Sequence, residues 1–254
     1  AMDIVSAIQT TLSYLEVPML AQRKELDSLT GEDIILSMKH MIDESGINEN
    51  VFYKTFRKAP LPKPVLKRVF QQYFYYIRTF PQILAGTSHR TENELIRMKL
   101  ARTVVSELGD GVGEAHFLMF QRVLKGVGIE LDDWQTVDYI PEAHQLVDGL
   151  KRIFLEGSTE HAIGAHYIIE EFGFPMIANL YEGFRLYEGW KHEDFTYFYL
   201  HMLVETDHVE WISDAVMEAA RHGDKGGDIL EGAHDVLGLL TQFWKGLNRI
   251  ATHS

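Results

Sequence analysis

Hydrophobic residues recur every three or four positions along most of the chain. This spacing places apolar side chains on one face of an α-helix, whereas the alternation that is typical of β-strands is missing. The pattern therefore predicts an all-α protein. The expected helices cover residues 4–15, 32–44, 48–57, 62–86, 91–108, 114–127, 142–156, 159–188, 193–222 and 227–250.

Residues that start or stop helices agree with these boundaries. Thr30 and Asp33 resemble a capping box, and Gly46 and Gly128 stand where helices are expected to end. Pro175 lies inside the longest expected helix, which it should kink or split. Helices that lack a sheet must pack on one another as a bundle, and side chains from several helices can meet in the core of a bundle.

Composition narrows the class of protein. Hydrophobic residues make up 46% of the 254 positions and charged residues 24%, as in globular proteins with one sizeable core. No uninterrupted run of 18 apolar residues suggests a membrane span. We therefore expect one domain over residues 1–254, located in the cytoplasm and without a membrane partner. The opening Ala1 and Met2 resemble a cleavage scar from expression.

Charge and cysteine content exclude several kinds of chemistry. A net charge of −13 argues against an extended nucleic-acid surface, which requires clustered Lys and Arg. With no cysteine, the chain has no disulfide, no thiolate nucleophile and no Cys-based metal site. Any metal must be bound by His, Asp and Glu side chains.

The stretch HMLVETDH brings three ionisable residues onto one face of an expected helix. His201, Glu205 and His208 fall within about 60° of one another around the helix axis. If this helix is buried, leaving these groups unpaired would cost several kcal/mol each, by order of magnitude. A metal ion is one partner that would satisfy all three, and a stripe with ordinary hydrogen bonds is the alternative.

The stretch AIGAHYIIEEFGFP offers a further carboxylate. Glu170 follows His166 by four residues and shares its helix face, whereas Glu171 is rotated by about 100°. One glutamate should therefore point inward and the other outward. A surface position for Glu170 is the alternative, and His166 is expected to support the site rather than to bind a metal.

The stretch VVSELGDGVGEAHFLMF contains two more candidates. Glu107 and His116 are nine positions apart, which on an unbroken helix places them on opposite faces. Both could bind one metal only if the backbone breaks between them. Gly109, Gly111 and Gly113 make such a break easy, because glycine adopts conformations that other residues avoid. A phosphate-binding glycine loop is rejected, since no strand precedes it.

A different bundle chemistry is also considered. Ferritin-like di-iron proteins use two Glu-x-x-His pairs, and this chain has Glu205 with His208 and Glu231 with His234. That arrangement would leave His201 without a role. A surface location is therefore expected for Glu231 and His234.

The ordered motifs QQYFYYIRTFPQILAG, SELGDGVGEAHFLMF, AIGAHYIIEEFGFP with NLYEGF, and HMLVETDH resemble one known family. These are the haem-oxygenase-like di-iron oxidases, relatives of the Chlamydia protein associating with death domains, of PqqC and of TenA. The resemblance runs from about residue 48 to residue 222 and implies a seven-helix bundle that holds two iron ions. The ligands that it implies are Glu107, His116, Glu170, His201, Glu205 and His208. The family more often has Asp at the position of Glu205.

The resemblance implies that two Fe(II) ions reduce O2 and oxidise a bound organic molecule. The expected substrate is a small carboxylate-bearing metabolite, foremost an amino acid in specialised biosynthesis, and the expected reaction is N-oxygenation, desaturation or carbon–carbon cleavage. An external electron donor and a homodimer are compatible with this hypothesis. Candidate substrate-binding residues are Arg78, Arg97, Arg102, Arg185, Tyr76, Phe117 and His166.

Two rival functions stay open at this stage. The first is a metal-free oxidase of the PqqC kind, and the second is a bundle that buffers metal without catalysis. A thiaminase of the TenA kind would need a cysteine, which the chain lacks. Haem binding is not expected, because no matching proximal histidine stands in an N-terminal helix.

Overall fold

The computed structural model describes residues 20–253, and all of the regular secondary structure in this range is helical. This confirms the predicted all-α class. The expected helix 4–15 and the expected scar at residue 1 lie outside the described residues. The α-helices are α2 Leu20–Asp27, α3 Gly31–Ser45, α4 Val51–Lys58, α5 Lys63–Arg90, α6 Glu94–Glu107, α7 His116–Gly126, α8 Pro141–Lys151, α9 Thr159–Phe184, α10 Thr196–Ala219 and α11 Gly226–Thr252.

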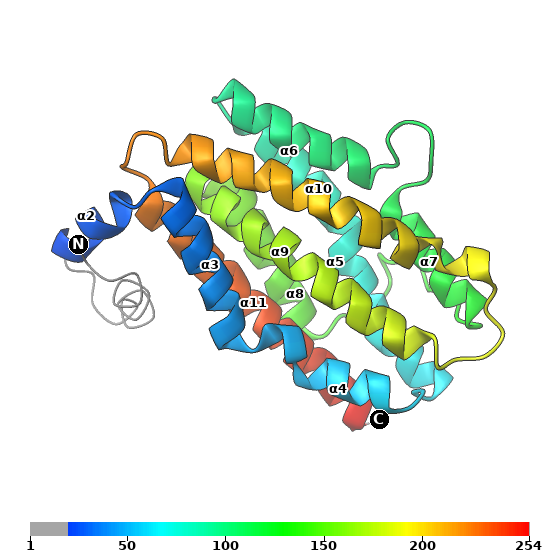
Figure 1. The fold of residues 1–254 in the computed structure, drawn as a ribbon. Helices are drawn as coiled ribbons and strands as arrows, with labels where there is room; N and C mark the ends of the chain where they lie inside the picture. The colour runs from blue at the N-terminus through cyan, green and yellow to red at the C-terminus, as the bar shows by residue number, and fades with distance from the viewer. Residues whose placement is uncertain (1–19, 254) are drawn as a thin grey trace.

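The long helix α9 is the centre of the bundle. It packs most extensively against α11 on one side and α10 on the other, while α5 packs against α6 and α8. Figure 1 shows α9 and α10 running side by side, with α3 and α4 on one flank and α6 and α7 on the other. Their apolar faces share one continuous core, rich in fully buried aromatic rings such as Phe70, Phe120 and Trp244.

Local signals explain where several helices begin and end. The predicted capping box is present, since Thr30 Oγ1 accepts a hydrogen bond from the Asp33 amide and the Asp33 carboxylate accepts one from the Thr30 amide. Gly46 ends α3 with a φ of 66°, in the left-handed region that favours glycine. Each predicted helix within the described range has a counterpart in the structure, and its ends differ from the predicted ends by a few residues.

The structure differs from the predicted helices in four respects. The helix α2 was missed, the expected helix 142–156 ends in a π-helical turn over Arg152–Glu156, and a 3-10 turn over His192–Phe195 precedes α10. Of the two predicted effects of Pro175, a kink or a split, the split is wrong, because α9 is continuous there. Burial of α9 between α10 and α11 outweighs the roughly 3 kcal/mol that an interior proline costs a helix.

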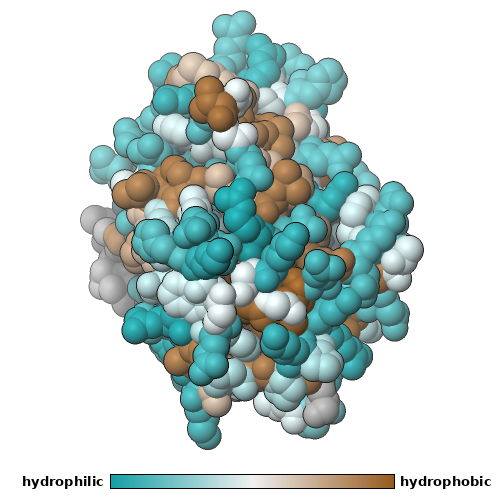
Figure 2. Space-filling view, turned by 90° about the vertical axis from the view of Figure 1, so that its right-hand side faces the viewer, coloured by the Kyte–Doolittle hydropathy of each residue, from teal (hydrophilic) through white to brown (hydrophobic). Residues whose placement is uncertain are grey.

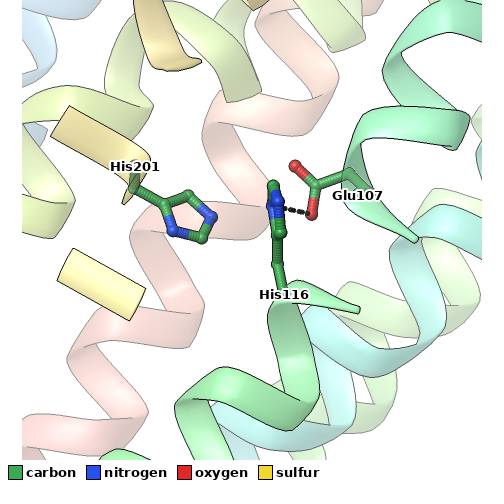
Figure 3. A group of neighbouring side chains, drawn as sticks. All are labelled: Glu107, His116 and His201. Carbon is green, nitrogen blue, oxygen red and sulfur yellow. Dashed lines mark ion pairs between the residues drawn. The ribbon is translucent and has the colours of Figure 1, made fainter. Parts of the chain in front are cut away.

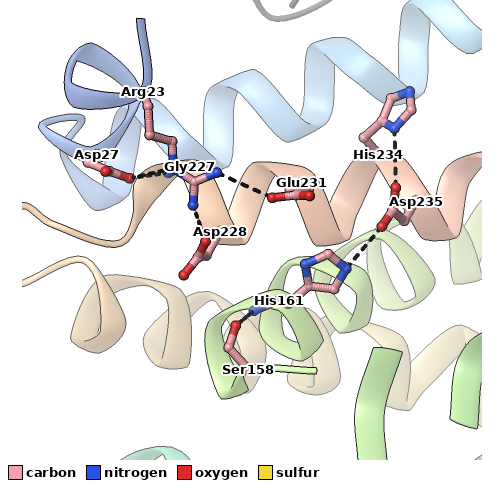
Figure 4. Close-up of polar contacts among 9 residues, drawn as sticks. All are labelled: Arg23, Asp27, Ser158, His161, Gly227, Asp228, Glu231, His234 and Asp235. Carbon is pink, nitrogen blue, oxygen red and sulfur yellow. Dashed lines mark hydrogen bonds and ion pairs between the residues drawn. The ribbon is translucent and has the colours of Figure 1, made fainter. Parts of the chain in front are cut away.

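Polar contacts join α2, the first helix of the described range, to α11 (Figure 4). The Arg23 guanidinium contacts Asp27 at 3.4 Å, Glu231 at 3.2 Å and also Asp228. Farther along α11, His234 Nδ1 lies 3.5 Å from the Asp235 carboxylate. Glu231 is exposed and His234 is partly exposed, so the predicted surface location of the second Glu-x-x-His pair is confirmed.

No helix in the described range is both long and apolar enough to cross a bilayer. Figure 2 shows a face on which hydrophilic side chains surround separate hydrophobic patches.

Candidate metal centre

The ends of α6 and α7 bring two predicted ligands together. Glu107 is the last residue of α6 and His116 is the first residue of α7. The segment between them turns back on itself through Gly109, Asp110 and Gly111, all of which have a positive φ. The predicted break in the backbone is therefore present, and it places both side chains on the same side of the bundle.

Glu107, His116 and His201 form one group of inward-pointing donors (Figure 3). Glu107 Oε2 lies 3.1 Å from His116 Nδ1, and the His116 and His201 rings have centroids 4.6 Å apart. His201 Nδ1 donates a hydrogen bond to the Tyr197 carbonyl oxygen at 2.7 Å, which leaves Nε2 for another partner. One ligand atom from each of the three residues lies within 4.8 Å of the others. This geometry can hold a metal ion.

His208 and Glu170 extend this group on the other side of Glu107. His208 Nδ1 lies 3.6 Å from Glu107 Oε1 and 3.3 Å from Glu170 Oε2. Its other nitrogen, Nε2, lies 2.9 Å from Ser106 Oγ. The two oxygens of Glu107 therefore face different histidines, Oε2 toward His116 and Oε1 toward His208. A carboxylate in this position can bridge two ions.

The two neighbouring glutamates of α9 point in opposite directions, as predicted. Glu170 is buried, and its Oε1 accepts a hydrogen bond from His166 Nε2 at 2.7 Å. Glu171 is partly exposed and lies 3.8 Å from the Lys39 ammonium group. His166 is buried one turn before Glu170 and orients its carboxylate by this hydrogen bond. Its role in supporting a metal site stays a prediction.

Glu205 lies in α10, one turn after His201 and three residues before His208. Its side chain is outside the part of the structure that is described. Its place in the ligand set therefore stays a prediction from the resemblance.

The charges of the site depend on one another. Burial raises the pKa of Glu107, but contact with His116 and the charges of His116, His201 and His208 outweigh burial and lower it overall. For Glu170, burial is likewise outweighed, here by His208 and His166, so its pKa is lowered. Burial lowers the pKa of His201 to about 4, against an opposing effect of Glu107. Anionic carboxylates beside a neutral imidazole are the forms that bind a cation.

A small cavity of about 60 Å³ opens beside these donors. Two predicted substrate-binding residues, Tyr76 and Phe117, are among the residues that line it, whereas His166 is not. The full lining is Tyr76, Ile77, Phe80, Glu107, His116, Phe117, Ile169, Glu170, Gly173, Met176, Tyr197 and His201.

The four arginines that are candidate substrate-binding residues are not among the residues that line this cavity. Arg78 and Arg102 each stack on a tryptophan ring, with guanidinium carbons 3.8 and 4.4 Å from the ring centroids. Arg97 and Arg185 are exposed and pair with nearby glutamates. A role of these arginines in substrate binding stays a prediction.

The hydrogen bonds by which Ser106 and the Tyr197 carbonyl hold two of the imidazoles were not predicted from the sequence. Tyr197 could have been found, because it lies four residues before His201, where a helical carbonyl can accept a bond from the imidazole. Ser106 had no such signal, because its partner His208 is 102 positions away.

Ser106→Ala should weaken metal binding on the His208 side of the site. With Nδ1 turned to the carboxylates, Nε2 of His208 carries the hydrogen and donates it to Ser106 Oγ. Loss of such a supporting bond typically costs about 10 to 100-fold in metal affinity. Anaerobic Fe(II) titration should show one iron bound as in the wild type and one bound more weakly.

Ser37→Ala is the matched control, because Ser37, like Ser106, is a buried serine in a helix. Its hydroxyl donates to the Asp33 carbonyl and does not contact a candidate ligand. It should leave iron binding unchanged. Equal iron binding by both variants would show that Ser106 does not position His208.

The metal-free protein should lose stability as the pH falls from about 6.5 toward 4. A histidine whose pKa is lower in the folded state binds protons preferentially in the unfolded state, so acid favours unfolding. The pKa of His201 is about 4 in the folded protein and about 6.5 in the unfolded chain. At pH 5 this difference lowers the free energy of unfolding by about 2 kcal/mol. Urea unfolding at pH 7.5 and pH 5 should show a smaller difference for His201→Gln than for the wild type.

His253→Gln removes an exposed histidine and serves as the control for that experiment. It should keep the wild-type difference between the two pH values. A His201→Gln variant that also keeps it would contradict the prediction.

Comparisons with known proteins agree with this geometry. A family described as iron-containing redox enzymes matches residues 67–240. The chain is 24% identical over 202 residues to 4-chloro-allylglycine synthase of Streptantibioticus cattleyicolor, with 80% of this chain and 77% of that protein covered.

Solved structures show the same fold. A CADD-like protein of Nostoc punctiforme superposes with a TM-score of 0.75 at 16% identity, covering 87% of this chain and 98% of that one. A TenA homologue of Pseudomonas syringae pv. tomato gives 0.68 at 15% identity, covering 83% and 92%. A protein of Shewanella denitrificans with a haem-oxygenase-like fold gives 0.61 at 14% identity, covering 86% and 94%. The predicted haem-oxygenase-like fold is confirmed.

Proposed function

Because the chain belongs to the family of iron-containing redox enzymes, we propose that it is a di-iron oxidase that uses O2 to oxidise an amino acid. The family makes it an oxidoreductase with iron as its metal. The number of irons, the role of O2 and the substrate are the finer parts of the proposal.

The position of Glu107 is the observation that carries the two-iron assignment. We assign Glu107, His116 and His201 to one ion, and Glu170 and His208 to the other, with Glu107 between them. Oxygen and imidazole donors without thiolate suit iron or manganese. Glu205 is added from the resemblance alone.

The chemistry that bound iron supplies is the reduction of O2 coupled to oxidation of an organic molecule. The residues of this chain do the rest. Glu107 and Glu170 contribute negative charge, which favours the higher oxidation state. Tyr197 and His166 fix the orientation of His201 and Glu170 by hydrogen bonds. The apolar part of the cavity lining, which includes Ile77, Phe80 and Ile169, limits access of water to the reacting atoms.

The amino-acid part of the proposal is supported by the relative that is 24% identical to this chain. Its name states that it makes 4-chloro-allylglycine, which is an α-amino acid. An external electron donor would restore the reduced metal between turnovers.

Oxygen consumption with and without amino acids tests this function. Protein loaded anaerobically with Fe(II) is mixed with O2 in the presence of single L-amino acids, and products are identified by mass spectrometry. We expect at least one amino acid to accelerate O2 consumption and to give a product with altered hydrogen or oxygen content. A rate that is indifferent to every amino acid would favour the metal-buffering alternative, and full activity after removal of iron would favour the metal-free one.

A further inference from the structure

His201 stands near the start of α10, and no side-chain hydrogen bond caps this end of the helix in the described structure. α10 begins at Thr196, directly after the 3-10 turn His192–Phe195. The first four N–H groups of a helix find no partner within it, so contacts with other helices decide where an uncapped end lies. The direction of the His201 imidazole therefore depends on what holds the first turn of α10.

Tyr197 joins this first turn to the imidazole by two contacts. Its carbonyl oxygen accepts the hydrogen bond from His201 Nδ1 at 2.7 Å. Its ring lies against the imidazole, with centroids 4.2 Å apart and planes tilted by 50°. A displacement of Tyr197 would therefore displace His201 as well.

The hydroxyl of Tyr197 is in turn bonded to a residue of another helix. It lies 3.0 Å from the hydroxyl of Tyr73, which belongs to α5 and stands 124 positions earlier in the chain. Tyr73 is 0% exposed and Tyr197 is 3% exposed, so bulk water does not compete for this hydrogen bond. A hydrogen bond in such surroundings is stronger than one at the surface.

The ring of Phe120 packs against both tyrosines. Its centroid lies 5.0 Å from that of Tyr73 and 5.1 Å from that of Tyr197, and both contacts are edge-on. Phe120 belongs to α7, the helix that begins with His116. The two tyrosines and this ring therefore join α5, α7 and α10, and two of these helices carry a candidate ligand on the His116–His201 side of the site.

We propose that Tyr73 is a positioning residue of the metal centre. Its hydroxyl anchors Tyr197, and through Tyr197 it fixes the first turn of α10 and the direction of the His201 imidazole. This inference rests on the assignment of His201 as a ligand in the proposed function. It adds to that function a residue from α5, a helix that carries none of the candidate ligands.

NMR of the metal-free protein gives the first test. His201 Nδ1 donates to a carbonyl oxygen, so the wild type should show a slowly exchanging imidazole N–H resonance, which His201→Gln identifies by its absence. Tyr73→Phe removes the hydroxyl and keeps the ring. It should shift this resonance and speed its exchange with water by about fivefold, the factor that one lost hydrogen bond typically contributes.

Anaerobic titration with Fe(II) gives the second test. Tyr73→Phe should bind the iron on the His116–His201 side about 10-fold more weakly, at the low end of the effect of losing a supporting residue. Tyr197→Phe removes the other hydroxyl of the same hydrogen bond and should weaken this iron by a similar factor. The double variant should lose no more than either single variant, because all three lack the same bond.

Tyr53→Phe is the matched control. Tyr53 is also a fully buried tyrosine, but its hydroxyl has no hydrogen-bond partner in the described structure. This variant should keep the His201 resonance, its exchange rate and both iron affinities. The melting temperature of each variant shows that it is folded, and Tyr197→Phe provides the same test if Tyr73→Phe does not fold.

The two tests separate this inference from the proposed function. An unchanged His201 resonance in Tyr73→Phe would overturn the inference, because ring packing alone would then hold Tyr197. A shifted resonance with both iron affinities unchanged, or the same changes in Tyr53→Phe, would also overturn it. If the wild type binds fewer than two irons while the resonance depends on Tyr73 as predicted, the di-iron assignment fails and the role of Tyr73 in holding His201 stands.

Discussion

Glu107→Ala is expected to remove both irons from the protein. Its two carboxylate oxygens face His116 and His208, so the variant takes one ligand from each proposed metal position. Loss of a supporting residue typically costs about 10 to 100-fold in metal affinity, and loss of a shared ligand should cost at least about 100-fold. Iron content after desalting should fall from two per chain to near zero, and O2 consumption with the amino-acid substrate should fall with it.

Glu171→Ala is the matched control for Glu107→Ala. It also removes one glutamate, but from the outward side of α9 beside Lys39. It should retain both irons and wild-type O2 consumption. If Glu107→Ala keeps two tightly bound irons while circular dichroism shows an intact fold, Glu107 is not shared between them.

Gly109→Ala should disrupt the segment that brings His116 back to Glu107. Gly109 has a φ of 94°, and a Cβ atom there would lie 2.6 Å from the Gly113 carbonyl oxygen. Backbone strain of about 1 to 3 kcal/mol and overpacking of a similar size should together lower the free energy of unfolding by about 2 to 5 kcal/mol. Iron should be lost from the Glu107–His116 side of the site, as seen by Fe(II) titration.

Gly111→Ala is the control that separates the steric clash at Gly109 from the general effect of replacing a glycine that has a positive φ. Gly111 also has a positive φ, of 74°, but a Cβ atom there would meet open space. The expected cost is about 1 kcal/mol, and iron binding should be retained. Equal stability and equal iron binding of the two variants would show that the close packing at Gly109 is not required.

Local patterns in the sequence account for much of this fold and site. Helical spacing predicts most of the helices, and the glycines between Glu107 and His116 predict the break that joins them. Neighbouring positions on a helix differ by about 100°, so the inward Glu170 could be told apart from the outward Glu171. The helices and the break between Glu107 and His116 depend on residues that are close in the sequence. The directions of Glu170 and Glu171 follow from the geometry of a helix.

Features that depend on contacts between distant segments could not be predicted in this way. Ser106 meets His208 across two helices, and nothing in the spacing of either residue indicates this pair. Arg78 and Arg102 each stack on a tryptophan ring, and the spacing of neither arginine indicates this contact. At Pro175, packing of α9 against α10 and α11 outweighs the tendency of proline to end a helix. These outcomes are decided by tertiary neighbours, which a single sequence does not reveal.

Anaerobic titration of the metal-free protein with Fe(II), followed by Mössbauer spectroscopy after exposure to O2, tests the central claim most directly. The arrangement around Glu107 predicts two irons per chain that become magnetically coupled when oxidised. One iron per chain, or two irons without coupling, would contradict a shared carboxylate and with it the di-iron oxidase.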